Sequence, residues 1–197
     1  MSARNAAFKS PSALKRERAV EAVGIEADPD AAAAAGARLD RVFEADLEEL
    51  LARPGAAAEL GSFDCLVAAD SLEHLRDPWV ALARAAELLE PGGAAVVSLP
   101  NVRFFETFWQ LGVRGRWPRR DQGIFDRTHL RWFTLRDARE LLEGAGLAVL
   151  EVRPVIRVRP LGSRFDRRFA WLARTPLREL FAFQFVLLAE RPPAGRR

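Results

Sequence analysis

Short, largely apolar segments alternate with helix-forming segments along this chain, and the alternation limits the folds that it can adopt. Residues 22–26, 41–45 and 63–69 predict three short strands. The first is followed by a helix signal, in which Asp28 is the cap, Pro29 occupies the first turn and a run of alanines follows. Strands that alternate with helices predict an α/β fold with parallel strands.

The second half of the chain continues this pattern. Asp77-Pro78 opens a helix that we expect to reach about Glu90, Pro91-Gly92-Gly93 predicts a sharp stop, and residues 94–99 predict a fourth strand. Thr134 is the expected cap of a helix over residues 135–144, and residues 147–156 and 183–189 predict two final strands. At 197 residues, with 49% hydrophobic and 29% charged residues, the chain is suited to forming one folded domain.

The first of these strands ends at an acidic residue, Glu26. In a doubly wound sheet, ligands bind outside the carboxyl ends of the strands, and a carboxylate there offers two acceptor oxygens to the two hydroxyl groups of a ribose. Glu26 is therefore a candidate ribose ligand. The alternative is an ordinary solvated carboxylate at the end of a strand.

Five stretches in this order carry a more specific signal: Val23-Gly24-Ile25-Glu26-Ala27-Asp28-Pro29, Ala45-Asp46-Leu47-Glu48, Phe63 to Pro78 with its Glu73-His74-Leu75-Arg76-Asp77-Pro78 element, Leu89-Glu90-Pro91-Gly92-Gly93, and Asp126-Arg127-Thr128-His129-Leu130-Arg131-Trp132-Phe133-Thr134. Together they resemble the class I S-adenosylmethionine (SAM) methyltransferases, within the methyltransferase type 11/12 group that has UbiE/UbiG-like and MetW-like members. The similarity runs from about Leu14 to Glu190. It implies a Rossmann-like α/β fold with a doubly wound, mostly parallel sheet.

The resemblance also implies roles for individual residues, with SAM as the cofactor. Glu26 would bind the ribose hydroxyls, Asp46 the adenine amino group, and Leu47 would supply a backbone amide. Asp70 and Ser71 would line the cofactor near its methionine part. For Asp46 the alternative is an ordinary helix cap.

One element of the family pattern is absent from the sequence. The family has a first strand followed by a loop of the type Asp-x-Gly-x-Gly-x-Gly, whereas this sequence has no glycine before Gly24. Residues 5–8, where the loop is expected, cannot form such a turn. We therefore expect the first strand to be missing from its place between the second and fourth strands of the family fold. Two hypotheses follow: strand and loop lie upstream of residue 1, or the chain is a degenerate relative that no longer binds SAM.

Residues 101–134 form an insertion in which eight aromatic residues alternate with seven arginines. Methyl transfer from a sulfonium requires alignment and exclusion of water, and an aromatic lid over the carboxyl ends of the strands suits that task. The alternative is a segment that packs on its own domain. His129, within this insertion, is the candidate general base, because a histidine can take a proton from a hydroxyl nucleophile. It could equally hydrogen-bond a backbone carbonyl and hold the lid in place, and His74 is more readily interpreted as structural.

Charge and cysteine content bear on partners and location. The single cysteine, Cys65, cannot form an internal disulfide, and no secretory signal or apolar run of about 18 residues is present, so we expect a cytoplasmic protein without a membrane span. The net charge is +3, with arginines concentrated after residue 153. Nucleic-acid binding is disfavoured, because the arginines are scattered among acidic residues and no RNA-binding signature is present.

These observations divide the chain into an atypical segment 1–14, a methyltransferase-like domain over 15–190 that contains the 101–134 insertion, and a basic tail over 191–197. The expected function is SAM-dependent methyl transfer to a small-molecule or saccharide- or lipid-linked acceptor. The alternative is a non-catalytic remnant or scaffold of the same fold. No metal site is expected, and the sequence does not indicate the nucleophile or the oligomeric state.

Overall fold

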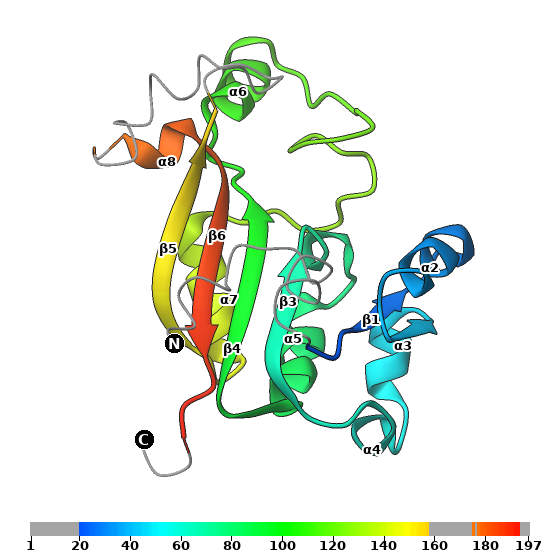
Figure 1. Ribbon diagram of the computed structural model, residues 1–197. Helices are drawn as coiled ribbons and strands as arrows, with labels where there is room; N and C mark the ends of the chain where they lie inside the picture. Colours follow the sequence, from blue (N-terminus) through cyan, green and yellow to red (C-terminus); the bar gives the residue numbers. More distant parts are fainter. Residues whose placement is uncertain (1–19, 158–174, 176, 194–197) are drawn as a thin grey trace.

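The computed structural model describes residues 20–157, 175 and 177–193, which form two units, one with a parallel sheet and one with a larger mixed sheet (Figure 1). In the smaller unit, β1 (Val23–Glu26) pairs in parallel with β2 (Arg41–Glu44). The larger sheet has the order β3-β4-β6-β5, formed by β3 (Phe63–Ala69), β4 (Leu89–Pro100), β6 (Ala182–Glu190) and β5 (Ala148–Ile156). In this larger sheet β3, β4 and β5 run in one direction and β6 runs against them. The predicted α/β class is confirmed.

The three helices that the sequence predicts begin at the expected residues, Pro29, Pro78 and Leu135. The helices are α2 (Pro29–Gly36), α3 (Leu47–Ala52), α4 (Ala56–Leu60), η2 (Leu72–His74), α5 (Pro78–Glu87), α6 (Phe105–Thr107), the π-helical η3 (Phe108–Val113), α7 (Leu135–Gly144) and α8 (Arg178–Phe181). Asp28 and Asp77 cap α2 and α5 by accepting backbone N–H bonds, and Thr134 and Asp137 form a reciprocal capping box on α7. No helix among the described residues has the length and apolar character needed to cross a membrane.

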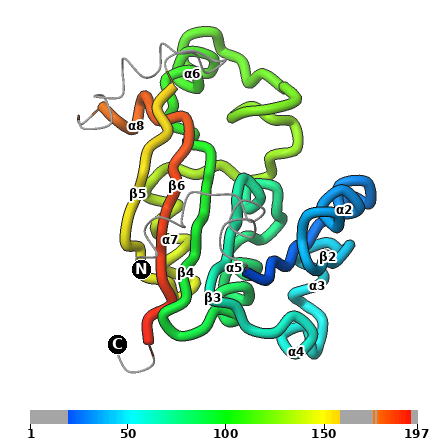
Figure 2. Tube along the Cα trace, in the orientation of Figure 1, coloured from blue at the N-terminus to red at the C-terminus, as the bar shows by residue number. Residues whose placement is uncertain are grey.

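The main hydrophobic core lies between the larger sheet and the two helices α5 and α7. Val97 of β4 and Leu187 of β6 are fully buried there, against Leu82 of α5 and Leu142 of α7. A second cluster joins the smaller unit to the larger one, because Leu50 of α3 packs with side chains of β1, β2, α4, α5 and β3. Figure 2 shows the chain passing from this smaller unit into β3 and α5.

The predicted sharp stop at Pro91-Gly92-Gly93 is wrong. The helix ends earlier, at Glu87, and β4 runs from Leu89 through these three residues. Gly92 adopts φ +85° and donates its N–H to the carbonyl of Arg191, while Arg191 donates its own N–H to Gly93. The glycines therefore form an irregular start to the strand, which pairing with the chain beyond β6 stabilises.

The sheet is interrupted between β1 and β3. Within the described residues, β3 pairs with β4 alone, β1 pairs with β2 alone, and no strand lies between them. Cys65 on β3 is consequently exposed. This interruption falls at the position where the first strand of the family fold was expected to be missing. Residues 1–14 lie outside the described residues, as do residues 194–197 of the basic tail.

The insertion 101–134 leaves the sheet beyond the carboxyl end of β4 and returns to it (Figure 1). Its two ends are joined by a bridge between Asn101 and Phe133, and a second bridge joins Arg120 to Asp126. Backbone N–H groups of Leu130 and Arg131 donate to the carbonyl of Glu73 at 2.9 and 3.0 Å. The insertion is therefore attached to the turn that follows β3.

Candidate active site

The predicted cofactor residues lie at the carboxyl ends of β1, β2 and β3. Glu26 and Glu44 are register partners, so β1 and β2 end at the same edge, with Asp46 two residues farther along. Glu26 accepts the N–H of Asp28 through Oε1 at 3.0 Å. Asp46 caps α3, because its Oδ1 accepts the N–H of Glu49 at 3.0 Å. Each of these bonds occupies one carboxylate oxygen.

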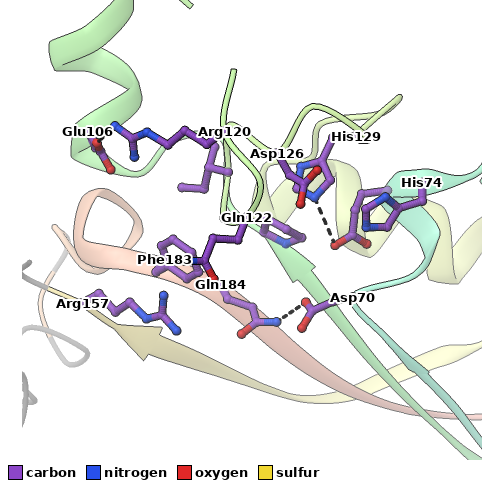
Figure 3. Close-up of a pocket in the computed structure, with 14 residues that line it drawn as sticks. Asp70, His74, Glu106, Arg120, Gln122, Asp126, His129, Arg157, Phe183 and Gln184 are labelled. Atoms are coloured by element: carbon purple, nitrogen blue, oxygen red, sulfur yellow. Dashed lines mark hydrogen bonds and ion pairs between the residues drawn. The ribbon is translucent and has the colours of Figure 1, made fainter. Parts of the chain in front are cut away.

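Asp70 follows β3 directly and is held by the neighbouring strands. Its φ of +51° is unusual for a residue other than glycine. Its backbone N–H donates to Ser98 Oγ at 3.1 Å, and its Oδ1 accepts hydrogen bonds from Ser98 Oγ and Gln184 Nε2. Contacts with β4 and β6 thus fix the direction of this carboxylate (Figure 3).

A cavity of about 680 Å³ opens beside Asp70, between the insertion and the ends of β3 to β6. Of the predicted site residues, Asp70 and His129 line it, whereas Glu26, Asp46, Leu47 and Ser71 do not. The remaining lining residues are Glu73, His74, Pro100, Glu106, Arg120, Gln122, Gly123, Ile124, Asp126, Arg157, Phe183 and Gln184. Of the predicted cofactor residues, only Asp70 therefore borders the cavity.

The wall next to Asp70 contains a buried carboxylate that the sequence analysis did not single out. Glu73 is 1% exposed, and neither of its carboxylate oxygens has a hydrogen-bond partner. Burial, with smaller contributions from the negative charges of Asp70 and Asp126, raises the pKa of Glu73 to about 7. Burying an ionised carboxylate without a hydrogen-bond donor is energetically unfavourable. We therefore expect Glu73 either to be protonated or to bind a cation.

His129 lies against Glu73 and is itself buried. Its Nε2 is 3.9 Å from Glu73 Oε1, as the dashed line in Figure 3 marks. Burial, together with the nearby His74, lowers the pKa of His129, so the ring is neutral near pH 7. The backbone of Ile124, in the same insertion, and the negative charge of Asp126 act in the opposite direction and favour the protonated ring.

His74 is fixed from the opposite side by Thr128. Nδ1 of His74 lies 3.0 Å from Thr128 Oγ1 and 3.3 Å from the Thr128 carbonyl oxygen. Thr128 donates its hydroxyl proton to Asp126 at 2.6 Å, so its Oγ1 accepts from His74. Nδ1 of His74 therefore carries a proton and donates it to Thr128.

The opposite wall of the cavity contains two arginines and a glutamate. Arg120 forms an ion pair with Glu106 at 2.6 Å, and the Arg157 guanidinium stacks over the Phe183 ring at 3.9 Å. The aromatic residues of the insertion do not line the cavity: Phe104 and Phe125 are buried in the domain, and Trp117 packs on Phe125. The insertion thus contributes mostly polar side chains to the cavity, and several of its aromatic residues pack on the domain.

A signal for the Glu73-His74-His129 cluster was present in the sequence. The chain has only two histidines, and each lies in a stretch that resembles the family. The resemblance placed His74 on the turn after β3 and His129 near the substrate side, but the two were interpreted separately. Their rings lie 4.8 Å apart and meet edge to face.

Comparison with known proteins identifies the family. A family model described as a methyltransferase domain matches residues 11–152. A SAM-dependent methyltransferase from Archaeoglobus fulgidus has a similar structure, with a TM-score of 0.60 and 15% identity over 90% of this chain and 79% of that one. SAM-dependent methyltransferases from Thermotoga maritima (TM-score 0.57, 17% identity, 86% and 72% covered) and Mesorhizobium loti (0.53, 17%, 86% and 79%) are also similar.

No curated protein matches the sequence significantly. The family match covers well over half of the chain, and the structural neighbours share its fold. The chain therefore belongs to the methyltransferase domain family and has the class I fold of SAM-dependent methyltransferases.

Proposed function

We propose that this protein transfers a methyl group from SAM to a small-molecule or saccharide- or lipid-linked acceptor that binds in the cavity beside Asp70. The observation that supports this most is the position of the cavity at the carboxyl end of β3, where it is lined by Asp70, Glu73 and His129. Ligands of doubly wound sheets bind at this edge. The family match and the structural neighbours support the reaction class.

The residues at the strand ends fit the polar groups of SAM. Glu26 and Asp46 end adjacent parallel strands and offer carboxylate oxygens to hydroxyl and amino donors. Asp70 borders the acceptor cavity, so its carboxylate is suited to the charged methionine part. When bound, SAM supplies a methyl group attached to positively charged sulfur. The methyl group would be transferred to the acceptor atom, and the electron pair of the broken carbon–sulfur bond would stay on the sulfur.

The chain's own contribution is to orient the acceptor and accept its proton. The neutral ring of His129 is the candidate general base, because its lowered pKa leaves a lone pair at neutral pH. Leu130 and Arg131 hold the segment carrying His129 against the turn at Glu73. The polar cavity walls, acidic at Asp70 and basic at Arg120 and Arg157, suit an acceptor rich in hydroxyl groups.

Methyl transfer can be tested with SAM labelled in its methyl group and a panel of hydroxyl-bearing acceptors, including sugars and polyprenyl-linked sugars. Label that enters one class of acceptor, and does so far more slowly with the His129→Asn variant, supports the proposal. A folded chain that binds SAM but transfers label to none of these acceptors would show that the proposed acceptor class is wrong. A folded chain that does not bind SAM would support the scaffold alternative.

A further inference from the structure

Both histidines of the chain meet one buried carboxylate at the cavity wall. One potential ligand atom from each of Glu73, His74 and His129 lies within 4.8 Å of the others. Glu73 and His74 belong to η2, whereas His129 comes from the insertion, so the fold itself assembles the cluster. All three side chains line the cavity (Figure 3).

The carboxylate of Glu73 is the group in this cluster that needs a proton or a cation to stabilise it. It is 1% exposed, and both of its oxygens lack a hydrogen-bond donor in the described structure. Buried carboxylates in folded proteins are paired with charges or bound to metals, because an unpartnered one is strongly unfavourable. His129 Nε2 is 3.9 Å from Glu73 Oε1, which is too long for a hydrogen bond.

The distance between Glu73 Oε1 and His129 Nε2 is close to that between two ligand atoms of one metal ion. Two atoms bound to a tetrahedral Zn²⁺ lie about 3–3.5 Å apart. Glu73 Oε1 and His129 Nε2 are slightly farther apart than this, so small side-chain movements would bring them to bonding distance.

The surroundings also resemble the outer shell of a metal site. Histidine ligands typically donate their other ring N–H to a carbonyl, carboxylate or hydroxyl that fixes the ring. His74 donates Nδ1–H to Thr128, which in turn donates to Asp126, so the His74 ring is fixed by a two-step chain. Because Nδ1 is engaged with Thr128, Nε2 is the ring nitrogen of His74 that would bind a cation.

We propose that Glu73, His74 and His129 bind one divalent transition-metal ion in the wall of the cavity. Two imidazoles and one carboxylate favour Zn²⁺ or a neighbouring first-row ion such as Co²⁺ or Mn²⁺ over Mg²⁺ and Ca²⁺, which prefer oxygen ligands. Three protein ligands would leave a coordination position open, as in catalytic sites, and all three residues line the cavity.

The role that we assign to the open coordination position of the ion rests on the proposed function. A hydroxyl oxygen of the acceptor can occupy it, and coordination lowers the pKa of that hydroxyl so that its proton passes to solvent. The ion then takes over the activating role that His129 would otherwise have alone. This assigns acceptors with a hydroxyl nucleophile to the site, in preference to those with a carbon nucleophile.

The test is a titration of the full-length, chelator-treated chain with CoCl₂ and ZnCl₂ in the absence of SAM. Calorimetry with Zn²⁺ and the visible ligand-field bands of Co²⁺ report stoichiometry and ligand type. We expect one ion per chain and bands that indicate nitrogen and oxygen ligands. Glu73→Gln and His129→Asn should each weaken binding more than 100-fold, and Thr128→Val about 10–100-fold.

Matched controls separate this site from adventitious binding. Glu106→Gln removes a carboxylate from the same cavity, and Cys65→Ser removes the exposed thiol; both should bind the ion as the wild type does. A folded wild type that binds neither ion would overturn the proposal, since the cluster would then hold only a proton. Binding that survives in both Glu73→Gln and His129→Asn would overturn it as well.

The titration is independent of methyl transfer. Glu73→Gln is nearly isosteric, and its circular dichroism and thermal unfolding show whether a lost ion reflects a lost fold. If the ion binds but SAM does not, the metal site stands and the proposed function fails. If SAM binds but the ion does not, the metal site is ruled out and the proposed function stands.

Discussion

Oε1 of Glu73 lies 3.9 Å from Nε2 of His129, in a part of the domain where Glu73 is 1% exposed and His129 8% exposed. One residue lies on the turn after β3 and the other in the insertion, so this pair forms where the insertion packs on the sheet. Two ionisable groups with pKa values shifted toward their neutral forms lie together at the cavity wall. Such shifts are typical of functional sites.

The raised pKa of Glu73 predicts how stability depends on pH. Because its folded pKa, about 7, lies above the ordinary glutamate pKa of 4.5, the native state binds the proton more tightly than the unfolded state does. The stabilisation is complete below about pH 4.5 and is lost as the pH rises through about 7, on the order of 3 kcal/mol in total. His129, with its lowered pKa, acts in the opposite direction.

The Glu73 contribution is isolated by comparing wild type with Glu73→Gln. Urea unfolding of both, with a chelator present and from about pH 5 to about pH 8, should show the wild type losing stability relative to the variant as the pH rises. A constant difference between the two proteins across this range would show that Glu73 titrates normally.

His129→Asn should reduce the methyl-transfer rate by about 10²–10⁴-fold while leaving SAM binding intact. The reason is that His129 lines the cavity proposed for the acceptor and is not among the residues proposed to bind SAM. Rates from release of S-adenosylhomocysteine, and affinities from calorimetry, measure the two effects separately. Unchanged turnover in the variant would remove His129 from the mechanism.

Glu26→Gln should weaken SAM binding by about 10–100-fold, because a charge-assisted hydrogen bond contributes about 1.5–3 kcal/mol. Glu44→Gln is the matched control, since Glu44 is the register partner of Glu26 on β2. Calorimetric titration of both variants with SAM shows whether only Glu26→Gln loses affinity. Equal affinities would assign Glu26 to the ordinary solvated strand end.

Packing between α7 and the sheet should dominate stability. Leu142→Ala removes a fully buried side chain and should cost about 2–5 kcal/mol of unfolding free energy. Leu150→Ala, at a position on β5 that is 55% exposed, should cost less than about 1 kcal/mol. Denaturant unfolding of the two variants measures both values, and similar losses would contradict the described core.

Local signals predicted most of the fold. The strand over residues 63–69 and the helix over residues 135–144 have the predicted bounds, because their apolar patterns and their capping residues agree. The Pro91-Gly92-Gly93 segment was misjudged because its conformation depends on pairing with Arg191, at the far end of the chain. Local sequence carries no information about such a partner.

The site was predicted less completely. The strand-end positions of Glu26 and Asp46, and the cavity positions of Asp70 and His129, followed from topology and resemblance. The burial of Glu73 did not, because it depends on the insertion folding back over η2. A glutamate in a polar turn ordinarily faces solvent, and only the tertiary packing reverses this.

The central claim, that this chain is a SAM-binding methyltransferase, is tested most directly by calorimetric titration of the full-length protein with S-adenosylhomocysteine. The account predicts one site per chain with a dissociation constant of about 1–100 μM, near −8 to −5 kcal/mol of binding free energy. A chain that shows cooperative thermal unfolding but releases no heat with either S-adenosylhomocysteine or SAM would contradict the account and leave the non-catalytic scaffold in its place.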